Sequence, residues 1–523
     1  MTERMLLNNA HLPGKSGLFS IGIHTGEIET VIEMEDTTIR GTESIDLDGA
    51  FILPGLWDSH LHLELLTSRL HAIDCEAHTK WDCLDEVQKA ANSTDDNRWL
   101  IGFNWNHNIW EPAEYGTAQE LDSVSGNHPV LLFAKSLHAC WVNSATLSLA
   151  GITNDTPDPV GGEILRDASG QPTGVLLENA MGLVNKVIPP LRPHELADQM
   201  RSTQTYLHSL GLTGVHDFDR FESFEALRML TERGERTLEV VKNLPADAID
   251  QILEHDFRDE LSKMGVTPGW IKAFADGALG PQSAAMIDPY ENSTNYGLLL
   301  LHPEEILELG LKAAKAGWPL AIHAIGDSAN QTVLDGFELL RQAETKRNLP
   351  HLRHRVEHVQ CLRQEDFKRF GELDIIASVQ PIHFPSDQEM ARRYWGKRNA
   401  FAYAYRSLHE EGAELVFGSD APVESPNPFL GMQAAVYRPN ELSIDLPKDW
   451  PSSQSLPLSV VLEAYTLAPA KIAGLGCVGQ ILPGHLANLI TLPVDPFKQS
   501  PAELGNIKPL HTFVRGKLVY SAL

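Results

Sequence analysis

The stretch PEEILELGLKAAKAGWPLAIHAIGD, residues 303–327, contains the alternation that decides the fold of this chain. Apolar residues at helical spacing in residues 303–317 predict an amphipathic helix. The apolar run PLAIHAIGD that follows is typical of a buried strand. Because helical stretches alternate with such runs along the whole middle of the chain, the sequence predicts a parallel α/β fold.

Eight segments are expected to form the strands of this sheet. One is the run that precedes His60, and the others are residues 213–218, 238–244, 270–277, 319–327, 354–360, 374–381 and 414–420. Eight parallel strands with helices between them indicate a closed (β/α)8 barrel of the TIM type. The steps from Lys272 to His323 and on to His358 each span about one βα unit.

The barrel is expected to carry two additions. Residues 1–54 and 479–523 both read as short alternating strands, and we expect these ends to pair into one small β-sandwich domain. Residues 55–478 then form the barrel, with an insertion at about residues 65–190 after its first strand. Because loops that follow barrel strands shape the active site, the insertion is expected to cover that site as a lid.

The composition indicates a folded protein without a nucleic-acid partner. The chain has 523 residues, and 42% of them are hydrophobic, which is enough for large cores. The formal net charge of −28 argues against binding to nucleic acids or anionic membranes, and no run is long enough to span a membrane. Five scattered cysteines do not indicate a disulfide framework, and no signal peptide is recognisable, so we expect a cytoplasmic protein.

Residues with metal-binding chemistry recur at the ends of the predicted strands. They are His60 and His62 on the first strand, Lys272 on the fourth, His323 on the fifth, His358 on the sixth and Asp420 on the eighth. The C-terminal ends of all strands in such a barrel meet on one face, where active sites of this fold lie. Imidazoles and a carboxylate are the ligands of a zinc-like divalent ion.

Each of these residues taken alone has a plain structural alternative. A strand histidine is more often a core or surface residue, Lys272 alone would be assigned to a salt bridge, and Asp420 could cap a helix. A neutral lysine amine, however, can react with carbon dioxide to form a carbamate, an anion whose two oxygens could bridge two metal ions. The set as a whole, at strand ends and at unit spacing, therefore predicts a metal centre.

Five motifs resemble the signature of the amidohydrolase superfamily, namely PGLWDSHLHLE, WIKAFADGALG, AIHAIGD, RVEHVQ and GSDAPV. The motifs VNSATLSLAGI, GGEILRDASGQPTGVLLENA and GQILPGHLANLITL resemble its YtcJ-like branch, which includes N-substituted formamide deformylase-like enzymes. The last motif departs from the branch, because the usual acidic residue is Asn488 here. The resemblance covers nearly the whole chain and does not identify a substrate.

The resemblance implies a role for each ligand. The two histidines of the first strand would bind the more buried metal together with Asp420, and His323 and His358 would bind the more exposed one. Lys272, carboxylated, would bridge both metals. The implied cofactor is a pair of zinc ions, with manganese, iron or nickel as alternatives. Some members of the superfamily use one metal and no carbamate, so both arrangements stay open.

This ligand set predicts a metal-dependent hydrolase that cleaves a non-peptide, amide-type C–N bond of a small molecule. A hydroxide activated by the metal would attack the carbonyl-type carbon, and Asp420 would accept the proton and deliver it to the leaving nitrogen. The same site could hydrolyse an ester, a carbamate or a deaminable ring. A non-catalytic scaffold is disfavoured because relatives that lose catalysis usually lose ligands.

Four residues are predicted to contact the substrate. Trp105 and His107 in FNWNHNIW indicate an aromatic wall, with a place in the core of the insertion as the alternative. His138 matches a position where the resembling branch tends to place a histidine near the substrate. Asp276 follows Lys272 by four residues and could instead cap a turn. The expected partners are a small-molecule substrate and, as one alternative, a second copy of the chain in a homodimer.

Overall fold

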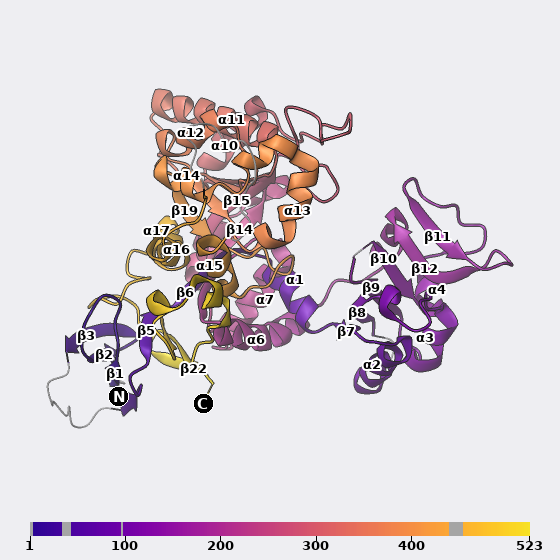
Figure 1. Cartoon of the computed structure of the whole chain (residues 1–523), viewed down its shortest axis with the longest axis horizontal. Coiled ribbons are helices and arrows are strands. Elements are labelled where there is room, and N and C mark those ends of the chain that lie inside the picture. Colours follow the sequence, from indigo (N-terminus) through magenta and orange to yellow (C-terminus); the bar gives the residue numbers. More distant parts are fainter. Residues whose placement is uncertain (1–3, 34–42, 96–97, 137, 439–452, 523) are drawn as a thin grey trace. The chain divides into compact units, whose positions relative to one another are not determined.

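The computed structural model describes residues 4–33, 43–95, 98–136, 138–438 and 453–522. The chain divides into two compact units, whose helices and strands are drawn in Figure 1. An apolar core lies within each of them. Unit 1 comprises Met1–Leu66 and Leu196–Leu523, and unit 2 comprises Thr67–Glu195. Within the described ranges, no helix is both long and apolar enough to cross a membrane.

Unit 1 contains an eight-stranded sheet in which all neighbouring strands run parallel. Its strands, in spatial order, are β6 (Leu56–Leu61), β13 (Leu212–Asp217), β14 (Glu239–Pro245), β15 (Thr267–Phe274), β16 (Leu320–Ala324), β17 (Arg355–His358), β18 (Ile376–Val379) and β19 (Glu414–Phe417). The predicted (β/α)8 fold class is confirmed, since each of the seven segments predicted between residues 213 and 420 overlaps one of these strands.

The segment that follows β19 closes the barrel against β6. Ala421 forms a parallel bridge with the last residue of β6. The backbone amide of Asp420 donates to the carbonyl of His60 at 2.6 Å, and the amide of His62 donates to the carbonyl of Ala421 at 2.9 Å. Closure therefore brings the polar side chains that follow the first and last strands next to each other.

Helices alternate with the barrel strands. The helix predicted over residues 303–317 is α10 (Pro303–Ala314), with His302 as its N-cap and a proline as its first residue. It packs on α11 (Asp327–Arg347), which ends at Asn348 in the left-handed conformation typical of a helix C-terminus. The other helices of the barrel are α6 (Pro193–Ser209), α7 (Phe221–Glu232), α8 (Ile249–Glu254), α9 (Phe257–Lys263), α12 (Phe367–Glu372), α13 (His383–Trp395), α14 (Tyr405–Glu410), α15 (Pro428–Val436), α16 (Leu458–Tyr465) and α17 (Leu467–Ile472).

Two four-stranded sheets make up the β domain of the predicted fold class, and one of them combines strands from both ends of the chain. One consists of β1 (Arg4–Ala10), β2 (Phe19–His24), β3 (Glu27–Glu33) and β4 (Glu43–Asp46), and the other of β5 (Phe51–Pro54), β20 (Leu489–Leu492), β21 (His511–Val514) and β22 (Lys517–Ser521). β5 pairs antiparallel with β20. One apolar core contains residues from both ends, among them Ile21, Ile52, Leu489 and Phe513. Because β5 belongs to this β domain, the first barrel strand, β6 (Leu56–Leu61), begins after β5 and Gly55.

Unit 2 is inserted in the sequence between β6 and β13. Its six-stranded sheet has the order β11-β12-β10-β9-β8-β7. The strands are β7 (Ile73–Asp74), β8 (Leu100–Trp105), β9 (Val130–Ala134), β10 (Ala139–Val142), β11 (Gly162–Arg166) and β12 (Pro172–Glu178). The helices are α2 (Lys80–Ser93), α3 (Ala118–Ser125), α4 (Ser144–Leu149) and α5 (Gly182–Asn185). A further helix, α1 (Leu63–Leu70), begins in unit 1 and ends in unit 2. Trp105 and Trp141 lie in its core and donate their indole N–H groups to the carbonyls of Leu132 and Thr117.

Candidate metal centre

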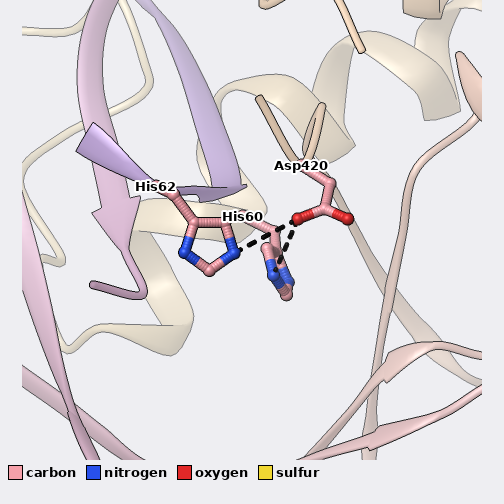
Figure 2. A group of neighbouring side chains, drawn as sticks. All are labelled: His60, His62 and Asp420. Carbon is pink, nitrogen blue, oxygen red and sulfur yellow. Dashed lines mark ion pairs between the residues drawn. The ribbon is translucent and has the colours of Figure 1, made fainter. Parts of the chain in front are cut away.

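His60, His62 and Asp420 form a compact group at the closure of the barrel (Figure 2). The Nε2 atoms of both histidines lie 3.4 Å from Oδ1 of Asp420. One ligand atom from each residue lies within 4.8 Å of the others, which is the spacing that a shared metal ion requires. Because the backbone pairing between Asp420 and β6 fixes this arrangement, the group depends on barrel closure.

The other predicted ligands lie beside this group. The ring of His358 lies 5.0 Å from that of His60 and 4.4 Å from that of His323, measured between centroids. The amine of Lys272 lies 4.9 Å from the ring centre of Phe218, which stacks on His60 at 4.0 Å. The structure therefore gathers the six residues that the sequence predicted as ligands.

Hydrogen bonds leave one nitrogen available on three of the histidines. Glu357 accepts from Nδ1 of His60 at 2.7 Å, and the side-chain oxygen of Gln380 lies 2.9 Å from Nδ1 of His358, so the Nε2 atom of each is available. In His323 the two ring nitrogens have the opposite roles: Nε2 donates to the carbonyl of Gly277 at 2.9 Å, and Nδ1 remains available. Such partners on the second nitrogen are typical of metal-binding histidines.

The electrostatic environment favours neutral imidazoles at most positions. Burial and the charge of Lys272 lower the pKa of His60 to about 4 and that of His323 to about 3. Burial also lowers the pKa of His358. Burial would lower the pKa of His62 as well, but the hydrogen bonds and charges of Asp219 and Asp420 raise it to about 9. Neutral imidazole is the form that binds a metal.

Lys272 is the buried cation of this cluster. Only 6% of the residue is exposed, and among the described residues its Nζ atom has no hydrogen-bond partner. Burial lowers the pKa of its amine to about 8. An unpartnered buried amine costs free energy, so Lys272 fits a residue that gains an anionic group in the functional protein.

The backbone at two predicted ligands is strained. His358 has φ 75° and Asp420 has φ 59°, a left-handed conformation that residues other than glycine rarely adopt. Next to Asp420, Gly418 lies so close to β6 that a Cβ atom there would be 2.5 Å from the amide nitrogen of His60. Conformations of this kind persist where the surrounding structure enforces them, often at functional sites.

Asp276 lies beside the cluster but is occupied by backbone groups. Its carboxylate accepts from the amides of Ala285, Ile325 and Gly326, and its Oδ1 lies 3.5 Å from Nε2 of His323. Burial raises the pKa of Asp276 to about 7 although these amides lower it. These bonds favour a role in holding the loops after β15 and β16, and the predicted substrate contact stays a prediction.

The three other residues predicted to contact the substrate share a cavity within unit 2. Its volume is about 460 Å³, and Trp105, His107 and His138 line it together with Tyr115 and Glu178. The ring of His107 stacks on Tyr115 at 4.1 Å, and Nδ1 of His138 lies 3.0 Å from a carboxylate oxygen of Glu178. The sequence alternative for Trp105, a place in the core, also holds, because only 1% of it is exposed.

The sequence reasoning missed the partners of the histidine ligands. Glu357 and Gln380 bond to His60 and His358, and Asp219 lies 3.3 Å from Nδ1 of His62. The only signal was positional, since Glu357 and Gln380 lie within predicted strands and Asp219 directly follows one. Nothing in the sequence states which histidine each would reach.

Comparisons with known proteins agree with this architecture. The profile of the amidohydrolase family matches residues 43–520. YtcJ of Bacillus subtilis (strain 168), whose name assigns it to the amidohydrolases, is 32% identical over 527 residues, covering 95% of this chain and 97% of that protein. N-substituted formamide deformylase of Arthrobacter pascens is 29% identical over 518 residues, covering 93% and 92%.

A solved structure shows the same fold. An uncharacterised metal-dependent hydrolase from Pyrococcus furiosus matches with a TM-score of 0.77 at 26% identity, covering 95% of this chain and 100% of that one. The predicted resemblance to the YtcJ-like branch is confirmed, and the chain belongs to the amidohydrolase family.

Proposed function

We propose that this chain hydrolyses an amide-type, non-peptide C–N bond of a small molecule at a binuclear metal centre. Family membership makes it a metal-dependent hydrolase. The proposed ligands are His60, His62, Lys272, His323, His358 and Asp420, and the proposed metal is zinc, with manganese, iron or nickel as alternatives. A divalent cation supplies a Lewis acid that activates water near neutral pH and polarises a carbonyl oxygen.

The observation that carries this proposal is the buried Lys272 amine beside the imidazoles. It has no partner among the described residues, and burial favours its neutral form. A neutral amine can attack the carbon of CO2, form an N–C bond and release a proton, which leaves an N-carboxylate. This anion could lie between two cations, whereas an ammonium would be repelled by them.

Asp420 is proposed to move the proton of the reaction. Burial would raise the pKa of its carboxyl, but the hydrogen bond from His62 and the positive charge of that histidine hold the pKa well below its usual range. The ionised carboxylate is the form that accepts a proton from the attacking water. It then returns the proton to the leaving nitrogen, so that the amine departs neutral.

The cavity of unit 2 is proposed to bind the apolar or aromatic part of the substrate. Its His107–Tyr115 stack supplies an aromatic wall, and the His138–Glu178 pair supplies polar groups. Asp276 is proposed to contact the substrate beside the metal centre, and its bonds from three backbone amides would hold its carboxylate in place there.

The test begins with metal analysis of the purified protein. About two equivalents of tightly held metal after growth with added zinc would support a binuclear centre, and no tightly held metal would contradict the proposal. A screen of N-formyl and N-acyl amines, cyclic imides, carbamates and esters then identifies the bond. Turnover of esters alone would contradict the proposed C–N specificity.

A reducing compartment is the proposed location. All five cysteines lack a disulfide, and Cys477 alone of them is exposed. Fractionation of the cells that make the protein would test a cytoplasmic location. The predicted homodimer stays a prediction, which light scattering of the purified protein would test.

A further inference from the structure

Glu357 contacts His60 through one short hydrogen bond in the barrel interior. Its Oε2 atom lies 2.7 Å from Nδ1 of the imidazole, and both side chains are fully buried. An ionised carboxylate can only accept, so Nδ1 of His60 carries the proton. The lone pair of Nε2 then faces Oδ1 of Asp420, 3.4 Å away.

Two contacts together restrict His60 to one orientation. Phe218 stacks on its ring at a centroid distance of 4.0 Å and an angle of 9° between the planes, which fixes the plane of the imidazole. The hydrogen bond to Glu357 then fixes which edge faces the barrel interior and which faces Asp420. Without Glu357, the stacking contact alone would allow the ring to flip within the same plane.

Arg355 holds Glu357 in place. Its Nε lies 2.5 Å from Oε1 of Glu357, and its Nη2 donates to Oε2 at 3.0 Å. The guanidinium also donates to the carbonyl of Ser59 on β6 at 2.9 Å and to the hydroxyl of Ser378 on β18 at 2.5 Å. Because it is anchored to two strands besides its own, Arg355 leaves the carboxylate little freedom to move.

We propose that Glu357 is a positioning residue that sets the tautomer and ring orientation of His60 for metal binding, with Arg355 as its anchor. The inference rests on the metal centre proposed above and adds the groups that prepare one of its ligands. Partners that orient metal-binding histidines typically change metal affinity by about 10–100-fold when they are removed.

The test compares Zn²⁺ affinity of the full chain and of Glu357→Gln, measured by competition with a chelating dye. We expect the variant to bind Zn²⁺ about 10–100-fold more weakly. The Co²⁺-loaded proteins give a second readout, since a change in the orientation of His60 alters the visible absorption of the bound Co²⁺. Neither measurement requires a substrate.

The chain offers a matched control at the opposite end of the barrel strands. His354 precedes β17, is fully buried, and its Nε2 lies 3.3 Å from Oε1 of Glu344. Arg341 donates to the other oxygen of Glu344 at 2.7 Å. Glu344→Gln therefore disturbs the same kind of buried histidine–carboxylate–arginine contact away from the proposed ligands, and we expect its Zn²⁺ affinity and Co²⁺ spectrum to match those of the wild type.

Three outcomes would overturn the proposal. One is a folded Glu357→Gln with unchanged Zn²⁺ affinity and Co²⁺ spectrum, and another is an equal loss of affinity in Glu344→Gln, which would indicate a general effect of stability. If Glu357→Gln does not fold, the double variant Arg355→Met/Glu357→Leu removes the buried charges together. The third outcome is that this double variant binds Zn²⁺ as tightly as the wild type. If the wild type itself binds no metal, the proposed function fails instead.

Discussion

Nε2 of His62 lies 3.4 Å from Oδ1 of Asp420, although one residue follows the first strand of the barrel and the other follows the last. This contact exists because backbone hydrogen bonds join the segment after β19 to β6. The metal centre proposed here is therefore assembled by the same closure that completes the fold. Changes to Asp420 should affect both metal binding and the proton transfer assigned to it.

Asp420→Asn should lower hydrolysis strongly while the protein stays folded. The amide keeps the shape of the side chain but can neither accept the proton nor contribute its negative charge to a cation. For the substrate found by screening, we expect kcat to fall by about 10²–10⁴-fold, with weaker retention of zinc. Asp374→Asn, at the N-terminal side of β18, is the matched control and should keep full activity. Full activity of Asp420→Asn would exclude the proton transfer.

Lys272→Met should remove the bridging group. Methionine is of similar length and apolar, so it suits a position where only 6% of the residue is exposed. We expect metal content to fall from about two ions to about one. The metal-free variant should be at least as stable to heat as the metal-free wild type, because an unpartnered buried amine is lost. Metal loading under CO2-depleted buffer should give the wild type the same deficit and leave the variant unchanged.

Two results would contradict this prediction. Two ions retained by Lys272→Met would exclude a bridging role, and insensitivity of the wild type to CO2 would exclude the carbamate. Lys471→Met, which removes an exposed lysine paired with Glu414, controls for the loss of a positive charge and should keep the full metal content.

The sequence predicted the barrel because its strands are short apolar runs separated by helical stretches. That periodicity places residues such as Lys272, His323 and His358 at the same end of neighbouring strands, since parallel strands share one direction. Their convergence therefore follows from local pattern plus one rule of topology. No knowledge of individual contacts was needed.

The partners of these residues could not be predicted in the same way. Glu357 reaches His60 across the barrel interior, and that contact depends on barrel geometry and on the anchoring by Arg355 rather than on spacing along the chain. Asp276 is predicted to contact the substrate from its place after Lys272, and nothing in the sequence indicated that amides of the loops after β15 and β16 would also donate to its carboxylate. Because every residue except proline carries a backbone N–H group, the sequence does not show which amides will donate to a given carboxylate.

The cavity of unit 2 leads to a prediction about substrate affinity. His107 stacks on Tyr115 at 4.1 Å, and removal of one ring deprives an apolar substrate of that face. We expect Tyr115→Ala to raise KM by about 2–10-fold with little change in kcat. Trp81→Ala removes an exposed aromatic residue of the same unit that does not line the cavity, and it should leave KM unchanged. If Tyr115→Ala has the same KM as the wild type, the proposal that this cavity binds the substrate is wrong.

His208 should make stability depend on pH. It is buried on α6, Nδ1 donates to the carbonyl of Leu212 at 2.8 Å, and Nε2 lies 2.9 Å from the hydroxyl of Thr237. Burial lowers its pKa from 6.5 to about 4, although the bond to Leu212 raises it. The unfolded chain therefore takes up this proton first as the pH falls, so stability is complete above about pH 6.5 and is lost between about pH 6.5 and 4.

Urea unfolding of the wild type and His208→Gln at about pH 7.5 and 5 measures this contribution. At the higher pH the difference between the proteins reports packing alone. At about pH 5 the wild type should have lost about 2 kcal/mol more than the variant has lost over the same interval. Parallel losses in both proteins would show that His208 does not titrate in this range.

Gly418→Ala should weaken the barrel and the metal centre together. An added Cβ would lie 2.5 Å from the amide nitrogen of His60 and 2.8 Å from a carboxylate oxygen of Asp58, so the segment after β19 would have to move away from β6. We expect a loss of about 1–3 kcal/mol in the free energy of unfolding and weaker zinc retention, because the same movement carries Asp420 away from His60. Gly476→Ala, where an added Cβ meets no atom within 4 Å, should change neither quantity. Unchanged zinc retention in a destabilised Gly418→Ala would separate barrel closure from metal binding.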